Sequence, residues 1–86
     1  MEIKKELIKR EIAGDIILIP VGKTVYETNG LFVLNELGDF IWDLLPDAPD
    51  AQAICQAVLD NYEVSEEEAR SDVDEFLRKL KEMDIL

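Results

Sequence analysis

The chain has 86 residues, of which 48% are hydrophobic and 34% are charged, and its formal net charge at pH 7 is −11. This length and composition predict one folded domain spanning residues 1–86, and the negative charge argues against non-specific binding to nucleic-acid phosphates. No apolar run approaches the ~20 residues of a membrane span, and the first residues lack the apolar core of a secretory signal. We therefore expect a cytoplasmic protein.

The first third of the chain reads as β-strands. Two runs rich in β-formers, Leu7–Ile12 and Ile16–Val21, are separated by a short segment containing Gly14. Glycine supplies the positive φ of a tight turn, so we predict a hairpin. Pro20 cannot donate a ladder hydrogen bond and should lie near the end of its strand. The segment Thr24–Glu27 fits either a short strand or a loop.

A third strand, Leu31–Leu34, follows the turn signal Asn29-Gly30. Its four residues are all apolar, whereas a half-exposed strand should alternate apolar and polar side chains. Two explanations are open at this point. Either the helices of the domain cover both faces, or one face or edge of the strand is left for a partner.

Three helices are predicted in the remainder of the chain. Asn35 is positioned to cap the first, which Pro46 ends, and Asp50 to cap the second. Ser65 and Glu68 form a capping box at the start of the third. Strands followed by helices indicate an α+β fold.

The third helix has an apolar stripe and two expected ion pairs. Asp74–Arg78 and Glu75–Lys79 have the i,i+4 spacing that brings opposite charges together. The stripe is by default part of the core. Its members are Ala69, Val73, Phe76, Leu77, Leu80 and Met83.

Catalytic side chains are scarce. The chain has no histidine, which removes the usual base of nucleophile pairs and the commonest neutral metal ligand. Its one cysteine, Cys55, lies on the apolar face of the second helix, where a packed thiol is favoured over a reactive one. The sequence also lacks phosphate-binding glycine motifs and a complete calcium loop. We expect a protein that is not an enzyme and that uses no cofactor and no metal.

Three stretches carry a family resemblance, and in chain order they read REIAGDIILIPVG, LNELGDFIWDLL and YEVSEEEARSDVDEFLRKLKEMDIL. From about Leu7 to Leu86 the chain resembles the PqqD-like family. These are the precursor-peptide recognition elements of pathways that make ribosomally synthesised, post-translationally modified peptides. The resemblance implies a winged-helix-like fold, with a three-stranded antiparallel sheet followed by three helices (βββααα), and binding rather than catalysis.

The resemblance also implies a site and partners. The leader segment of a precursor peptide is held as an added strand beside the third strand and against the third helix. One alternate set of strand side chains then packs into the core, and the other, with the unpaired main-chain groups, meets the leader. The partners are the precursor peptide and a modifying enzyme such as a radical S-adenosylmethionine maturase or a lasso-peptide protease, with no nucleic acid and no membrane. The peptide-binding residues mapped in this way are Leu31, Phe32, Val33, Leu34, Asp72, Phe76, Lys79, Leu80 and Met83.

Three alternatives compete with this interpretation. A winged-helix DNA-binding regulator shares the topology, but acids outnumber bases in the third helix. An acyl carrier protein needs a serine in an Asp-Ser-Leu context, and neither Ser65 nor Ser71 has one. A homodimeric structural domain would instead pair its own edge strands with each other.

Overall fold

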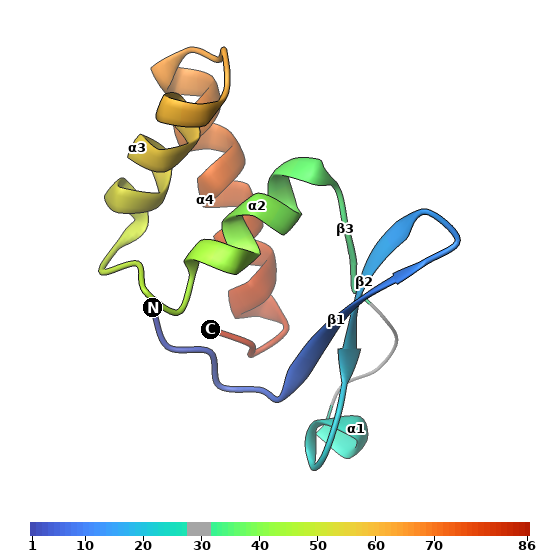
Figure 1. Cartoon of the computed structure of the whole chain (residues 1–86). Coiled ribbons are helices and arrows are strands. Elements are labelled where there is room, and N and C mark those ends of the chain that lie inside the picture. Colours follow the sequence, from blue (N-terminus) through green and yellow to red (C-terminus); the bar gives the residue numbers. More distant parts are fainter. Residues whose placement is uncertain (28–31) are drawn as a thin grey trace.

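The computed structural model describes residues 1–27 and 32–86, in which a small antiparallel sheet lies beside a group of helices (Figure 1). The sheet order is β1-β2-β3. The strands are β1 (Leu7–Ile12), β2 (Asp15–Pro20) and β3 (Phe32–Leu34), and the helices are α1 (Thr24–Glu27), α2 (Glu36–Leu44), α3 (Ala51–Asn61) and α4 (Glu66–Glu82). The predicted α+β order of three strands and three helices is confirmed, with one additional short helix, α1.

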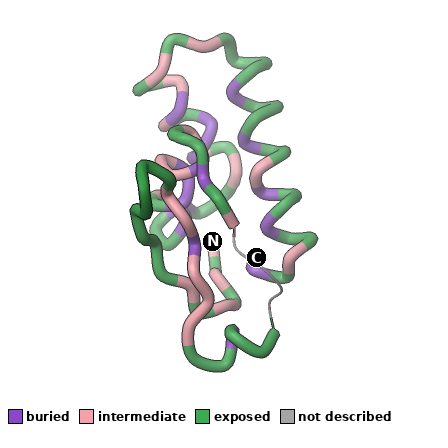
Figure 2. The backbone as a smooth tube through the Cα atoms, turned by 90° about the vertical axis from the view of Figure 1, so that its right-hand side faces the viewer, coloured by how far each residue is buried: buried purple, intermediate pink, exposed green. Residues whose placement is uncertain are grey.

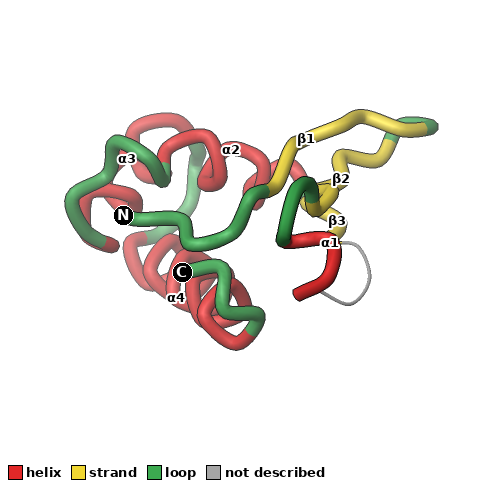
Figure 3. The backbone as a smooth tube through the Cα atoms, turned by 90° about the horizontal axis from the view of Figure 1, so that it is seen from below, coloured by secondary structure: helices red, strands yellow, loops and turns green. Residues whose placement is uncertain are grey.

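The β1–β2 hairpin forms where the sequence predicts it. Ala13 and Gly14 both have positive φ, 52° and 87°, as a two-residue type I′ turn requires. β2 begins and ends one residue earlier than expected, so Pro20 is its last residue. The tip of the hairpin projects away from the helices (Figure 3). The expected Asn29-Gly30 turn lies outside the described residues.

The segment Thr24–Glu27 is a single helical turn, neither the short strand nor the loop that the sequence left open. The N–H of Tyr26 donates to the carbonyl of Lys23 at 3.0 Å. The Thr24 side chain is buried, and its hydroxyl accepts a hydrogen bond of 2.8 Å from the N–H of Glu6. This tertiary contact, which the local sequence does not reveal, holds the turn against the segment before β1.

All three predicted helix caps are present. Each cap side chain accepts a hydrogen bond from the backbone N–H three residues later, which satisfies one of the unpaired donors of the first turn. The donor–acceptor pairs are Gly38 to Asn35 at 2.7 Å, Ala53 to Asp50 at 2.9 Å and Glu68 to Ser65 at 3.1 Å.

The hydrophobic core lies between the helices and the inner face of the sheet. Leu18 from β2, Ile41 from α2, Ile54 from α3 and Leu80 from α4 are almost fully buried there. Cys55 is buried too, as predicted for a packed thiol. Figure 2 shows the buried residues concentrated in the helices, with β1 and the hairpin tip exposed.

One of the two expected ion pairs on α4 forms. Lys79 Nζ lies 3.3 Å from Glu75 Oε1. The Asp74–Arg78 pair was predicted wrongly, because Arg78 instead contacts Glu82 at 3.2 Å. Arg78 has a carboxylate one turn before it and another one turn after it, and its side chain extends to the later one.

Candidate functional site

The sheet has two edges, and their side chains differ. No described strand pairs with the outer edge of β1 or with the edge of β3 that faces away from β2. β1 carries the charged run Lys9, Arg10 and Glu11, and charges on an edge strand discourage pairing with another chain. β3 has the sequence Phe-Val-Leu and carries none. Its edge is therefore the one open to an added strand.

The pairing register implies which backbone groups of β3 are available. The type I′ turn makes Ile12 and Asp15 a hydrogen-bonded pair, and such pairs alternate along an antiparallel ladder. Arg10 and Ile17 are then hydrogen-bonded, so Ile17 directs its N–H and C=O toward β1. Val33 lies opposite Ile17. It follows that Val33 directs its own N–H and C=O away from β2, toward the free edge.

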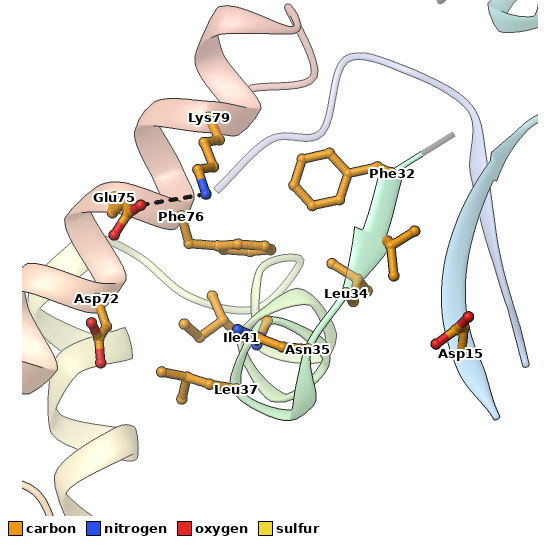
Figure 4. Close-up of a pocket in the computed structure, with 12 residues that line it drawn as sticks. Asp15, Phe32, Leu34, Asn35, Leu37, Ile41, Asp72, Glu75, Phe76 and Lys79 are labelled. Atoms are coloured by element: carbon orange, nitrogen blue, oxygen red, sulfur yellow. Dashed lines mark hydrogen bonds and ion pairs between the residues drawn. The ribbon is translucent and has the colours of Figure 1, made fainter. Parts of the chain in front are cut away.

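The side chains of β3 alternate between two faces. Phe32 is half-buried and Leu34 is buried on the helix side, while Val33 is 59% exposed on the outer face. The Phe32 ring meets Phe76 of α4 edge to face, with centroids 6.0 Å apart and planes at 82° (Figure 4). This contact spans the space between the edge strand and the last helix.

A groove with a volume of about 540 Å³ lies between β3, α2 and α4. Apolar groups form most of its floor and charged groups stand around it, so it offers an elongated peptide both burial and polar contacts. The apolar floor consists of Phe32, Leu34, Leu37, Gly38, Ile41 and Phe76. The remaining lining residues are Asp15, Val33, Asn35, Asp72, Glu75 and Lys79.

A tight strand-to-helix junction places α2 at the base of this groove. Leu34 ends β3, and Asn35 caps α2 directly after it. Gly38, in the first turn, packs so closely that a Cβ there would lie 3.2 Å from Cε1 of Phe76 and 3.4 Å from Cδ2 of Leu34. Glycine at this position therefore leaves room for the Phe76 ring.

Comparison with known proteins now identifies the family. A family model described as Coenzyme PQQ synthesis protein D (PqqD) matches residues 16–86. The chain belongs to the PqqD family. Among solved structures, it is similar to TbiB1 in complex with the TbiA(beta) leader peptide, with 24% sequence identity, coverage of 100% of this chain and 94% of that chain, and a TM-score of 0.75. At this identity the likeness shows the fold alone. No curated protein matches the chain.

The groove of this PqqD-family chain contains most of the residues predicted from its sequence. Leu31 lies outside the described residues. Leu80 is fully buried in the core, and Met83 is half-buried and packs against the core, so neither lines the groove. The predicted residues that do line it are Phe32, Val33, Leu34, Asp72, Phe76 and Lys79.

The position of Leu80 follows from the helical wheel of α4. The buried residues of this helix are Ala69, Val73, Leu77 and Leu80, at the i, i+4, i+8, i+11 spacing of one stripe. Phe76 lies at the border of that stripe, half-buried, on the flank that faces β3. The groove therefore borders the face of α4 that carries Phe76, next to the buried face that carries Leu80.

Sequence reasoning missed several lining residues and one detail of β3. Glu75 could have been predicted from the sequence, since it lies at helical spacing between Asp72 and Lys79. The wall that α2 contributes could not have been predicted in this way; it is formed by Leu37, Gly38 and Ile41. In addition, both sets of alternate β3 residues line the groove, Phe32 and Leu34 from the inner face and Val33 from the outer one, whereas only the outer set was expected to meet the leader.

The described residues of the groove form no charged cluster suited to metal chemistry. Within residues 1–27 and 32–86, no group of three or more His, Cys, Asp or Glu side chains is arranged to hold a metal ion. Cys55 lies away from the groove, and burial raises the pKa of its thiol. None of the described helices is long and apolar enough to cross a membrane. The described residues that line the groove offer apolar and polar contacts to a bound ligand.

Proposed function

We propose that this chain is a non-catalytic adaptor that binds the leader of a ribosomally synthesised precursor peptide and presents the rest of that peptide to a modifying enzyme. The leader adds to β3 as a fourth strand and lies along the groove facing α4. The observation that carries the proposal is the uncharged free edge of β3 beside a groove with an apolar floor and a charged rim. Membership of the PqqD family supports it, as does the leader peptide bound to TbiB1.

Strand addition explains why both the backbone and the side chains of β3 matter. Val33 offers one N–H and one C=O to the added strand, and main-chain hydrogen bonds supply sequence-independent affinity. Leader side chains entering the groove beside Phe32 and Phe76 supply specificity. Two or three such side chains contribute about 1.5–3 kcal/mol each, and ordering the leader takes back several kcal/mol. We expect a dissociation constant on the order of 1 μM, about −8 kcal/mol.

The proposed adaptor also has an enzyme as its partner. Because the adaptor binds only the leader, the segment to be modified stays accessible to a modifying enzyme, such as a radical S-adenosylmethionine maturase or a lasso-peptide protease. We place this reaction in the cytoplasm. A DNA-binding role is disfavoured by the first turn of α4, where Glu66, Glu67 and Glu68 would face phosphates.

The direct test is a titration followed by NMR. A synthetic peptide with the sequence of a candidate leader is added to ¹⁵N-labelled protein. Amide shifts are expected in β3 and on the Asp72–Lys79 flank of α4. Shifts confined to the β1–β2 hairpin would contradict the site. Light scattering with and without peptide distinguishes leader binding from a homodimer that pairs its own β3 edges.

Matched proline variants test the edge itself. Val33→Pro removes the outward N–H of β3, and Glu11→Pro removes the corresponding outward N–H from the opposite edge, on β1. We expect Val33→Pro to weaken leader binding at least tenfold, as fluorescence anisotropy measures, while Glu11→Pro binds like the parent protein. Retained affinity in Val33→Pro, together with a large loss of thermal stability, would refute strand addition at this edge.

A further inference from the structure

The two ends of the groove carry opposite charges. Lys79 of α4 lies at the Phe32 end of the groove, and its side chain extends along the helix to Glu75 (Figure 4). Asp72 lies two helical turns earlier, beside Leu37, and Asp15 of β2 lies on the other side, beyond Leu34. Glu75 also lines the groove and pairs with Lys79, so a ligand that spans the groove passes from an end with two acids to an end that holds a lysine and its partner acid.

The acidic end lacks internal neutralisation. Neither Asp15 nor Asp72 forms an ion pair within the described part of the chain. Among the described residues, Lys79 forms an ion pair with Glu75 alone, at 3.3 Å, with both side chains 54% exposed. An exposed pair of this kind is weak and exchanges readily for a charge on a ligand. All three end charges are thus available to a bound peptide.

The spacing of these charges corresponds to a short peptide segment. Asp72 and Lys79 are seven residues apart on α4, which is about 10.5 Å along the helix axis. An extended strand advances about 3.3 Å per residue, so this distance covers three to four positions. Because alternate side chains face the groove, positions i and i+4 reach the two charged ends, and position i+2 lies over the apolar floor.

The direction of the added strand then fixes the order of charges. Antiparallel pairing is slightly more stable than parallel pairing, and every strand in this sheet is antiparallel to its neighbour. A strand antiparallel to β3 begins near Leu34 and ends near Phe32. Its earlier residues therefore lie between Asp15 and Asp72, and its later residues lie beside Lys79.

We infer that the groove selects leader segments with Lys or Arg at position i, an apolar residue at i+2 and Asp or Glu at i+4, read from N- to C-terminus. Asp15 and Asp72 recognise the cation, and Lys79 recognises the acid. The inference rests on the proposed leader-binding function and adds to it the charge pattern of the ligand. The same residues in reverse order would place like charges together at both ends.

A selection experiment tests this pattern without knowledge of the natural leader. A displayed library of random twelve-residue peptides is selected on the full-length protein and on the double variant Asp72→Lys, Lys79→Glu. The parent protein is expected to enrich the cation–apolar–acid order, and the double variant the reverse order. The control double variant Asp74→Lys, Arg78→Glu makes the same exchange at exposed positions of α4 outside the groove and should enrich the parental order.

Two synthetic peptides give the size of the effect. They differ only in a central Lys-Thr-Leu-Thr-Glu or Glu-Thr-Leu-Thr-Lys, and binding is measured by fluorescence anisotropy. Each exposed charge pair contributes a factor of about two to five, so the first peptide should bind about tenfold more tightly than the second. The difference should disappear near 1 M salt, where the Debye length is about 3 Å.

The outcomes separate this inference from the proposed function. Equal binding of the two peptides, or enrichment of apolar residues with no charge order, overturns the charge pattern and leaves strand addition intact. Selected peptides that bind the Val33→Pro variant as well as they bind the parent protein overturn strand addition, and the charge pattern with it. Inverted enrichment on the reversed variant, with the control unchanged, supports both.

Discussion

The rings of Phe32 and Phe76 meet edge to face, with centroids 6.0 Å apart, and join the edge strand β3 to α4. Aromatic pairs prefer this arrangement because the positive edge of one ring approaches the negative face of the other. Both rings are only half-buried, so each keeps surface that a ligand can cover. The contact therefore holds the walls of the groove in place before any peptide arrives.

Removing one ring should weaken binding more than a comparable change elsewhere. Phe76→Ala takes away a groove wall, and we expect leader affinity to fall about tenfold or more, as the loss of a half-buried apolar contact implies. Phe40→Ala is the control, because Phe40 makes the same type of contact with Tyr62, at 5.3 Å, and does not line the groove. Both variants should lose thermal stability, and only Phe76→Ala should lose affinity in anisotropy titrations.

Gly38→Ala should uncouple stability from binding. Alanine is a better helix former by about 0.8–1.0 kcal/mol, which offsets the strain of a Cβ placed 3.2 Å from the Phe76 ring. The Phe76 ring, and the Asn35 side chain whose Oδ1 would lie 3.1 Å from the same Cβ, must move to relieve these contacts, and both line the groove. We expect an unfolding midpoint close to that of the parent protein, together with weaker leader binding. Unchanged affinity with a lower midpoint would place the strain in α2 rather than in the groove.

Local physical rules account for what the sequence predicted correctly. The caps Asn35, Asp50 and Ser65 were recognisable because a cap side chain serves an N–H only three residues away. The hairpin was recognisable because Gly14 supplies a positive φ that few residues tolerate. Such features depend on neighbours in the chain, so their positions were predicted to within about one residue.

The rest depends on contacts between distant segments. The apolar stripe of α4 is wider than the face that packs into the core, and sequence spacing does not separate Leu80 from Phe76, so the family resemblance assigned both to the groove. Only the placement of α3 and α2 against α4 decides that Leu80 faces the core and Phe76 does not. Gly38 was missed for the same reason, since its role is to accommodate a ring from another helix.

Asp84, just after the C-terminal end of α4, should make the folding stability of the protein depend on pH in the acid range. Asp84 follows the cap residue Met83 with φ 59°, and the N–H of Ile85 donates to the carbonyl of Leu80 at 2.9 Å, as in a Schellman motif. Hydrogen bonding to Lys4, at 3.3 Å, and the charges of Lys4 and Lys5 lower the pKa of the Asp84 carboxyl. A lowered pKa in the folded state stabilises the protein above the unfolded pKa, and the stabilisation is lost as the pH falls through the folded value.

Asp84→Asn tests this linkage, because asparagine also tolerates a positive φ while carrying no charge. The variant should unfold at a lower temperature than the parent protein at pH 7. The difference should shrink as the pH falls below about 3.8 and vanish once the parental carboxyl is protonated. Thermal unfolding followed by circular dichroism from pH 7 to pH 2 measures this. A difference that stays constant across the range would assign the effect to the turn rather than to the charge.

Cys55 should behave as a protected core thiol whose reactivity reports leader binding. Burial raises the pKa of the thiol, so the nucleophilic thiolate is scarce near neutral pH, and α3 must open before a reagent can reach it. We expect iodoacetamide to alkylate the native protein at least about a hundredfold more slowly than the urea-unfolded chain.

The effect of the leader peptide on this labelling is a second measurement. Where labelling requires global unfolding, leader peptide at 100 times its dissociation constant should slow the alkylation about another hundredfold, because the peptide binds only the folded state. Labelling at the rate of the unfolded chain would contradict the packed thiol, and slow labelling that ignores the leader would show that the helices open without disturbing the β3 groove.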